Sequence, residues 1–587
     1  MSKAVVAIVL CLSLPGTLFA AQVGQTGSAS GAPSAAPVSV PAISALAPAA
    51  GLSVPSGLGA PNLSLPPSAA GQSASAAAPS ASAVITLAPG AAAPFPTAAQ
   101  ISAAPAANQF GAAKGVNRAQ AFAAAQPAER APVSDESVRG KTLLLVGTRT
   151  SRPFIIEEAV RVAKALGVNL VLLDKEENRP NSAGLVADAD FVAAPIDKRD
   201  DKTMKSIADQ VQALSKTRQI DYVMAFRSHH AKLVGKIVDT TGIAGIQGRV
   251  ALTAEDKAKT RQALNTVPEQ AVPYREVKTV QEVREFYRQH GAHGKFVMKS
   301  KLGENSRFVE LDIDSEEKLV AAFTKMDAAL RAEAKKKESS DTIFNRYPGI
   351  IVERMLERAP GTVEASVEMV VKDGAVKFAM VSDTHGIGHQ GELAGGSMTF
   401  PSQMTPQIQD ALIAASAKAL EVVGLRDGNA RIDIMMTPDG PRVIEVNPFL
   451  GGAAIYTAVK LVSGVSLIEW GIRAMLGLSL PQTPAFASVV DYRFAASQHS
   501  GVIESVSGIE EAKQLPGVAH AQALAGAGDS VAKPIENGFE EWAEVMGLGA
   551  TFAAAVKASL EALKRIRARV VVEQSADYLQ PGAPKKK

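Results

Sequence analysis

The acidic and amide side chains of segment 431–448 (RIDIMMTPDGPRVIEVNP) have the types and the spacing of a metal site. Strand side chains alternate between two faces, so Glu445 and Asn447 share one face of a predicted strand. Pairing within a hairpin can bring Asp433 opposite them, and three oxygen ligands on a rigid sheet suit Mg²⁺. The alternative is a solvated polar face. Apolar neighbours, however, leave buried carboxylates to be explained; they are Ile432, Ile434, Val443, Ile444 and Val446.

The elements upstream of this hairpin predict a parallel α/β domain over residues 138–252. Two apolar runs of strand length flank a segment that has helical spacing and ends at Gly167. This order is typical of a Rossmann-like unit with helices on the faces of its sheet. The sequence lacks a clean G-x-G-x-x-G here, so dinucleotide binding is not predicted. The predicted strands and helices cover residues 141–150, 154–167, 168–174, 221–226 and 231–242.

Residues 253–480 predict a second domain, of mixed α and β structure, and residues 485–575 a small α+β domain. In the second domain, one predicted hairpin turns at Asp373-Gly374 and the Asp433 hairpin turns at Pro438-Asp439-Gly440. Glu353 lies inside an apolar strand, where a buried carboxylate needs a partner. Besides the hairpins 362–383 and 431–448, the predicted elements are helices 254–264, 405–425 and 552–570 and strands 295–300, 351–356 and 488–494.

Segment 431–452 (RIDIMMTPDGPRVIEVNPFLGG) resembles the signature of the ATP-grasp superfamily, in which an acid, a glycine turn and a Glu-x-Asn-Pro sequence hold two Mg²⁺ ions. The other segments of that family follow in its order between about Val138 and Leu480. The resemblance implies a pre-ATP-grasp domain at 138–252 and a two-lobed ATP-grasp domain at 253–480. It also implies that Asp433, Glu445 and Asn447 bind Mg²⁺, with Mn²⁺ as an alternative.

The same resemblance implies an ATP site. AEDKAKTRQAL and KFVMKS resemble the segments of two phosphate-contacting lysines, IVERML resembles the adenine hinge, and GTVEASVE resembles the segment whose first acid meets the ribose. Without the resemblance, Lys257 reads as a solvated helix residue and Lys299 as a lysine whose stem packs on an apolar strand. The implied ATP ligands are Lys257, Lys299, Glu353, the backbone of Met355 and Leu356, and Glu364.

Two features depart from the family pattern. The loop after Lys299, SKLGENSRFVE (300–310), contains few glycines, and Phe449 replaces the family's arginine after Asn-Pro. We expect Arg431 or Arg307 to supply the missing positive charge, the alternative being that both are surface residues. His389, in the segment THGIGHQGELAGGSMTFPS (384–402) that also carries His385, is considered as a base for an amine. The alternative is a loop histidine that is merely polar.

Segment 501–522 (GVIESVSGIEEAKQLPGVAHAQ) resembles the extra domain of the L-amino-acid and dipeptide ligases of this superfamily. The implied reaction joins a carboxylate, expected to be that of an amino acid, to an amine through an acyl phosphate, with ADP released. One alternative is a carboxylase of the same fold, although the Ala-Met-Lys-Met sequence of a biotinyl segment is missing. Another is an envelope binding module that has lost activity, which the altered loop and Phe449 favour and the retained metal ligands oppose.

Composition bounds the partners and the location. A formal net charge of +3 argues against a nucleic-acid partner. The partners that the resemblance implies are small-molecule carboxylates and amines. Lys3 and the apolar run 4–21 predict a secretory signal over 1–21, hence export to the periplasm or cell envelope; the alternative is an uncut membrane anchor. Cleavage would remove the single cysteine, Cys11, and leave no stable membrane span.

The ends of the folded part differ from it in composition. Residues 22–135 are rich in Ala, Pro and Ser and predict a disordered linker, since such a segment buries too little apolar surface to offset its ordering entropy. Residues 576–587 predict a solvated basic tail. Members of the superfamily often dimerise, so a homodimer is expected, although the sequence itself does not fix the oligomeric state.

Overall fold

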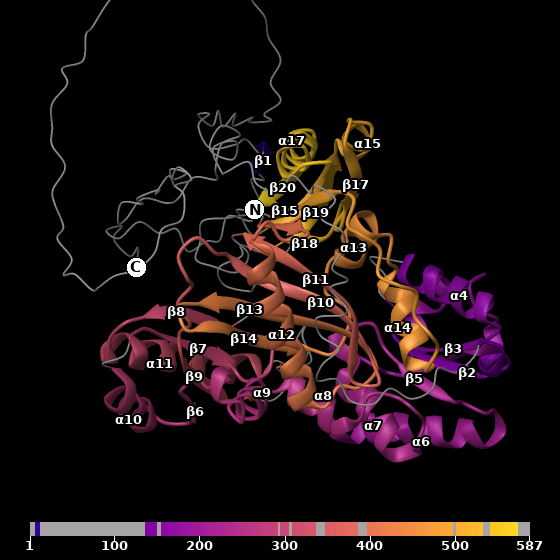
Figure 1. The fold of residues 1–587 in the computed structure, drawn as a ribbon, viewed down its shortest axis with the longest axis horizontal. Coiled ribbons are helices and arrows are strands. Elements are labelled where there is room, and N and C mark those ends of the chain that lie inside the picture. The colour runs from indigo at the N-terminus through magenta and orange to yellow at the C-terminus, as the bar shows by residue number, and fades with distance from the viewer. Residues whose placement is uncertain are drawn as a thin grey trace, which may run out of the picture. The chain divides into compact units, whose positions relative to one another are not determined.

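The computed structural model describes residues 6–11, 135–148, 154–291, 294–303, 308–335, 347–385, 396–496, 501–531 and 541–572. Figure 1 shows their helices and strands. The predicted linker lies outside the described residues except for Asp135. Within the predicted signal, β1 (Val6–Cys11) is described as a strand that pairs antiparallel with β20 (Arg567–Val572). The secretory signal and the export stay predictions.

The first domain has the predicted parallel sheet, in the order β4-β3-β2-β5. Every residue of β2 is buried, as expected for a parallel strand that helices cover on both faces. Leu143 and Leu145 pack towards α4, whereas Leu144 and Val146 pack towards α6 and α7. The bounds are β2 Thr142–Val146, β3 Asn169–Asp174, β4 Phe191–Ala193, β5 Tyr222–Met224, α4 Phe154–Leu166, α6 Asp201–Thr217 and α7 Ala231–Thr241.

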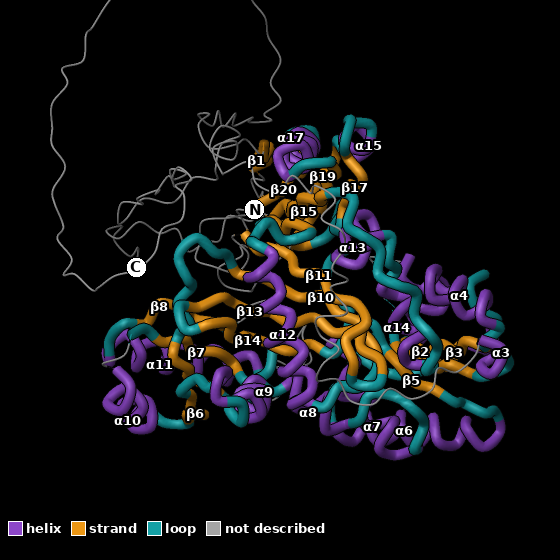
Figure 2. The backbone as a smooth tube through the Cα atoms, in the orientation of Figure 1, coloured by secondary structure: helices purple, strands orange, loops and turns teal. Residues whose placement is uncertain are grey.

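A second, antiparallel sheet has the order β6-β9-β7-β8. Two helices that Figure 2 shows beside these strands, α10 and α11, enclose a core around Phe296, Met298 and Val352. A capping box of Thr279 and Glu282 starts α10. The bounds are β6 Tyr274–Val277, β7 Phe296–Ser300, β8 Val309–Ile313, β9 Ile350–Arg354, α10 Val280–His290 and α11 Glu316–Glu333.

The largest sheet has the order β14-β13-β10-β11-β12-β15-β19-β17. One face of β10, β13 and β14 is apolar and packs against α12, which crosses these strands in Figure 1. On the other face, α13 and α14 cover the apolar part that includes Val370 and Met380. The bounds are β10 Glu364–Lys372, β11 Ala375–His385, β12 Ser397–Phe400, β13 Gly428–Thr437, β14 Gly440–Asn447, β15 Val489–Ala496, β17 Val518–Ala523, β19 Glu541–Gly549, α12 Pro406–Val423, α13 Ile455–Ser463 and α14 Leu467–Met475.

The mixed α/β class and its Rossmann-like first sheet are confirmed. Within the described ranges, no single helix is long and apolar enough to span a membrane, although α13 and α14, bent by 97°, together meet the length and composition criteria. The remaining elements are α3 Asp135–Val138, η2 Glu176–Asn178, α5 Arg179–Ser182, η3 Asp188–Asp190, η4 Ser228–His230, α8 Gly248–Glu255, α9 Lys257–Leu264, η5 Pro268–Gln270, β16 Gly501–Ser507, α15 Ile509–Lys513, β18 Ser530–Val531 and α17 Phe552–Leu563.

Three of the boundaries that differ from the sequence prediction have a clear physical reason. The predicted helix 254–264 is two helices, because Asp256 is extended and its carboxylate caps α9 by accepting from the amides of Ala258 and Lys259. The predicted helix 552–570 ends at Leu563, and the Val-rich stretch after it forms β20 against β16. The turn of the Asp433 hairpin is Pro438-Asp439 alone, since Gly440 pairs with Thr437.

The packing of α17 on β19 gives a stability prediction. A Cβ at Gly547 would overlap the backbone of Ala555 and Ser559, so Gly547→Ala must push α17 away. We expect a loss of about 2 kcal/mol in the free energy of unfolding, measured by urea denaturation. Gly526→Ala is the control, because nothing lies within 4 Å of a Cβ there. Equal stability of the two variants would contradict this close packing.

Candidate functional site

The register of β10, β13 and β14 places the polar residues of three strands on one face. Asp433 lies opposite Glu445 and Arg431 opposite Asn447. On the other side of β13, Ser366 pairs with Asp433 and Glu368 with Arg431. Paired residues share a face, so these side chains form one continuous group. We call it the polar row; it consists of Glu364, Ser366, Glu368, Arg431, Asp433, Glu445 and Asn447.

A bulge makes this arrangement compatible with a buried core. Val443 and Glu445 are two residues apart and would share a face in a regular strand. The register shifts between Asp433 and Ile434, so Ile434 pairs with Val443 and Ile444 is the extra residue. Val443 is therefore buried on the apolar face, while Glu445 joins the polar row.

Arg431 joins three members of the polar row. Its Nη1 donates to Glu368 Oε1 at 2.7 Å and its Nη2 to Ser366 Oγ at 2.6 Å. Its Nε lies 3.1 Å from Asp433 Oδ1, which also accepts from Ser366 Oγ at 2.7 Å. The guanidinium is thus held beside one of the predicted metal ligands.

The chemistry of the predicted metal ligands suits a Mg²⁺ ion that is also coordinated by a bound phosphate. The side chains of Asp433 and Glu445 keep 23% and 32% of their surface exposed. Within the described part of the chain, no group of three or more His, Cys, Asp and Glu residues could hold a metal ion. Mg²⁺ usually takes one or two protein carboxylates and completes its octahedron with phosphates and waters. Two carboxylates and the Asn447 amide fit that pattern.

Lys257 lies beside the polar row. Lys257 Nζ donates to the Gly303 carbonyl at 2.8 Å and lies 3.6 Å from Glu445 Oε1. Its backbone amide donates to the Lys301 carbonyl at 3.0 Å, which ties the start of α9 to the end of β7. An anion bound here would therefore meet an ammonium group whose backbone is already fixed.

Lys299 and Glu353 form one buried ionic group with Arg261. Glu353 accepts from Lys299 Nζ at 2.8 Å and from Arg261 Nε at 2.9 Å. Arg261 also donates to the Val443 carbonyl at 3.2 Å. Burial alone would raise the pKa of Glu353, but the two cations lower it to about 2. Lys299 and Arg261 are therefore the partners that the buried carboxylate of Glu353 requires.

The residues predicted to contact the base and the ribose lie at the end of β9 and at the start of β10. Met355 and Leu356 follow the end of β9, and the Met355 amide donates to the Lys295 carbonyl at 2.9 Å. A base contact from Met355 would therefore use its carbonyl oxygen instead. Glu364 begins β10, opposite Met435 and in the polar row.

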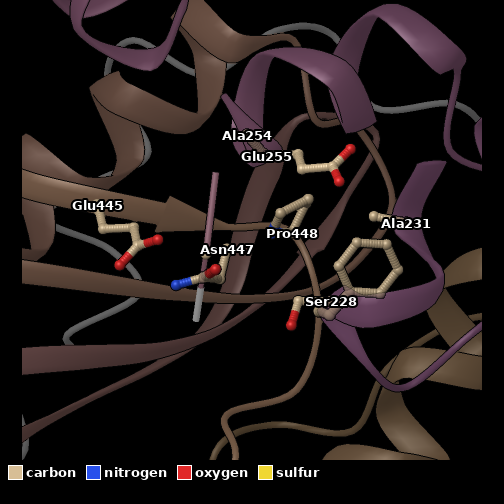
Figure 3. Close-up of a pocket in the computed structure, with 9 residues that line it drawn as sticks. Ser228, Ala231, Ala254, Glu255, Glu445, Asn447 and Pro448 are labelled. Atoms are coloured by element: carbon tan, nitrogen blue, oxygen red, sulfur yellow. The ribbon is translucent and has the colours of Figure 1, made fainter. Parts of the chain in front are cut away.

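A pocket opens next to Glu445 and Asn447. Figure 3 shows these two side chains on one side and Glu255 and Ala231 on the other, with Pro448 between. Glu255 is bound by Arg199, whose Nη1 also lies 3.4 Å from Nδ1 of His229. Burial, with help from Arg199, lowers the pKa of His229 to about 4, so its ring is neutral at pH 7. The lining residues are Ser228, Ala231, Ala254, Glu255, Gly303, Glu445, Asn447, Pro448 and Phe449.

Some predicted site residues are not brought to the polar row. His385 pairs with Ser397, one position beyond Thr384, which pairs with Glu364, so His385 points to the opposite face. Arg307 and His389 lie outside the described residues. Phe449, which replaces the family's arginine, is buried and lines the pocket.

The sequence analysis missed Arg261, Ser366 and Glu368. Arg261 lies four residues after Lys257 and so on the same side of α9, a spacing that could have revealed it. Ser366 and Glu368 alternate with Glu364 along one strand and were equally detectable by period two. The pocket residues Ser228, in η4, and Glu255, at the end of α8, carry no local motif.

Removing the charge of Glu353 tests the buried ionic group. Glu353→Gln leaves Lys299 and Arg261 without their shared anion, and we expect a loss of about 3 kcal/mol in the free energy of unfolding at pH 7. The folded-state pKa is below the unfolded value, so the wild-type advantage is complete above about pH 5 and declines as the pH falls towards 2. Urea denaturation at several pH values measures it. Glu136→Gln, an exposed control, should lose nothing; a pH-independent deficit in Glu353→Gln would contradict the ionic interpretation.

Comparison with known proteins places the fold. Residues 493–571 match the family model "L-amino acid ligase C-terminal domain 2". The crystal structure of an L-amino acid ligase from Bacillus licheniformis aligns with a TM-score of 0.60 at 18% identity, over 74% of this chain and 100% of that one. The biotin carboxylase domain of a Hydrogenobacter thermophilus 2-oxoglutarate carboxylase, in complex with MgADP, ADP and bicarbonate, aligns with a TM-score of 0.53 at 18% identity, over 73% and 91%.

Sequence relatives point the same way. Carnosine synthase 1 from Gallus gallus is 29% identical over 164 residues, which are 27% of this chain and 17% of that protein. The chain spans between 17% and 65% of the length of the curated relatives that it matches. The fold, the matched C-terminal region and these relatives confirm the resemblance to ATP-grasp carboxylate–amine ligases that the motifs indicated.

Proposed function

We propose that the protein uses Mg²⁺-ATP to join the carboxylate of a small molecule, expected to be an amino acid, to an amine, and releases ADP. The observation that carries the proposal is the polar row with Lys257 beside Glu445. Carboxylates for a metal, an arginine and a lysine for negative charge lie within one strand pair and the helix next to it. ATP-dependent activation of a carboxylate needs these groups and no covalent residue.

In this proposal, Lys257 and Lys299 bind the phosphates of ATP. To do so, Lys299 must share its charge between the phosphates and Glu353, to which it is bonded at 2.8 Å. Arg261 stays on Glu353 and keeps the carboxylate paired during that exchange. Asp433, Glu445 and Asn447 hold Mg²⁺, which when bound neutralises phosphate charge and orients the γ-phosphate. Glu364 contacts the ribose, and the hinge at Met355 and Leu356 contacts the base.

The substrate carboxylate attacks the γ-phosphorus, so that a carboxyl oxygen–phosphorus bond forms and the bond to ADP breaks. Arg431, whose guanidinium lies beside Asp433, stabilises the charge on the transferred group. The amine then attacks the acyl carbon, phosphate leaves, and the amine proton passes to solvent or to phosphate. The pocket beside Asn447 is proposed to hold part of a substrate, because it opens directly onto the metal ligands. Arg307 and His389 remain candidates outside the described residues.

Export by the segment 1–21 and a homodimer are also proposals. Export rests on the apolar run after Lys3 alone. The homodimer rests on the fact that members of the superfamily often dimerise.

Phosphate release by the full-length protein tests the proposed reaction. With Mg²⁺-ATP and pooled amino acids and amines, we expect phosphate in some pools only, and a rate about 100-fold lower in Glu445→Ala. Glu421→Ala, an exposed acid on α12, is the matched control and should keep the wild-type rate.

Melting temperatures with and without Mg²⁺-ATP separate the remaining outcomes. No phosphate in any pool and no rise in melting temperature would contradict the nucleotide site. A rise in melting temperature without turnover would support a nucleotide-binding module that has lost the reaction.

A further inference from the structure

Glu368 is a buried acid at the inner end of the polar row. It is 1% exposed and lies on β10 two residues before Val370, where the same face becomes apolar and is covered by α13 and α14. An acid at such a boundary is costly unless its charge is paired. The cation that pairs with it is Arg431, at 2.7 Å.

The loop after β14 closes over this acid. Gly451 lies so close to it that an added Cβ would be 3.0 Å from Glu368 Oε2 and 3.1 Å from Oε1. The same loop begins with Pro448 and Phe449, which line the pocket beside the metal ligands. A side chain at position 451 would therefore push either the loop or the carboxylate out of place.

The contacts of Arg431 show what Glu368 does for it. The guanidinium donates to Glu368 and Ser366 with its two terminal nitrogens, so both the position and the plane of the group are set from β10. Its Nε side is left towards Asp433, at 3.1 Å. Burial raises the pKa of Glu368 to about 7, and the guanidinium of Arg431 beside it opposes that rise.

We propose that Glu368 is a positioning residue that fixes the Arg431 guanidinium beside Asp433, so that Arg431 acts on the transferred phosphoryl group. This inference rests on the proposed function for its catalytic part. It explains why an arginine from β13 can serve where Phe449 follows the Asn-Pro sequence.

A double-mutant cycle on the full-length protein tests the catalytic part. Glu368→Gln keeps the shape and the acceptor oxygen but removes the charge, and we expect kcat to fall about 10-fold while KM for ATP changes less than about twofold. In an Arg431→Lys background the same change should cost almost nothing further, because Glu368 acts through Arg431. Full additivity of the two losses would overturn the proposal. Glu158→Gln is the matched control: this half-buried acid also holds partners, Lys460 and Ser466, but away from the polar row.

A spectroscopic readout separates this inference from the reaction itself. In protein labelled with ¹⁵N-arginine, the guanidinium signal of Arg431, identified by its loss in Arg431→Lys, should be resolved and protected from exchange. Glu368→Ala, which removes the acceptor oxygen that Gln would keep, and Gly451→Ala should abolish that protection, and Glu158→Ala should keep it. Protection that persists in Glu368→Ala overturns the inference whatever the activity. Loss of protection in a protein without turnover supports the positioning and contradicts only the proposed reaction.

Discussion

The antiparallel register of β10, β13 and β14 is the constraint on which the site depends. Because strand side chains alternate, a shift of one residue would move Asp433 and Glu445 to the face that α12 covers, and would expose Ile432 and Ile434. Burial of the apolar face therefore selects the register that assembles the polar row. The bulge at Ile444 lets Val443 stay in that core while Glu445 leaves it.

Charge across the site is balanced before a ligand binds. Lys257 is near Glu445, Arg431 lies between Glu368 and Asp433, and Glu353 is shared by two cations. In the proposed function, a nucleotide with its divalent cation exchanges these partners: phosphates take the lysines and the cation takes the acids. Such an exchange avoids leaving any buried charge unpaired, which would cost several kcal/mol.

The sequence was most informative where a feature depends only on local residue spacing. The Asp433, Glu445 and Asn447 spacing and the parallel strands of the first domain could be predicted, because period two and continuous apolar runs are local properties. The spacing of Glu368 and Arg261 could place each on a face of its strand or helix. It could not pair them with Arg431 and Glu353, which are 63 and 92 residues away and are brought to them only by the sheet register and the packing of α9. The predicted helix 552–570 failed because pairing with β16 overrode local helical spacing after Leu563.

A crystal structure of the protein with MgADP tests the central claim most directly. The account predicts Mg²⁺ at about 2.0–2.1 Å from carboxylate oxygens of Asp433 and Glu445, with the phosphates of ADP completing its coordination and Lys257 or Lys299 in contact with them. Nucleotide bound elsewhere, or a metal ion with neither carboxylate in its coordination shell, would contradict it.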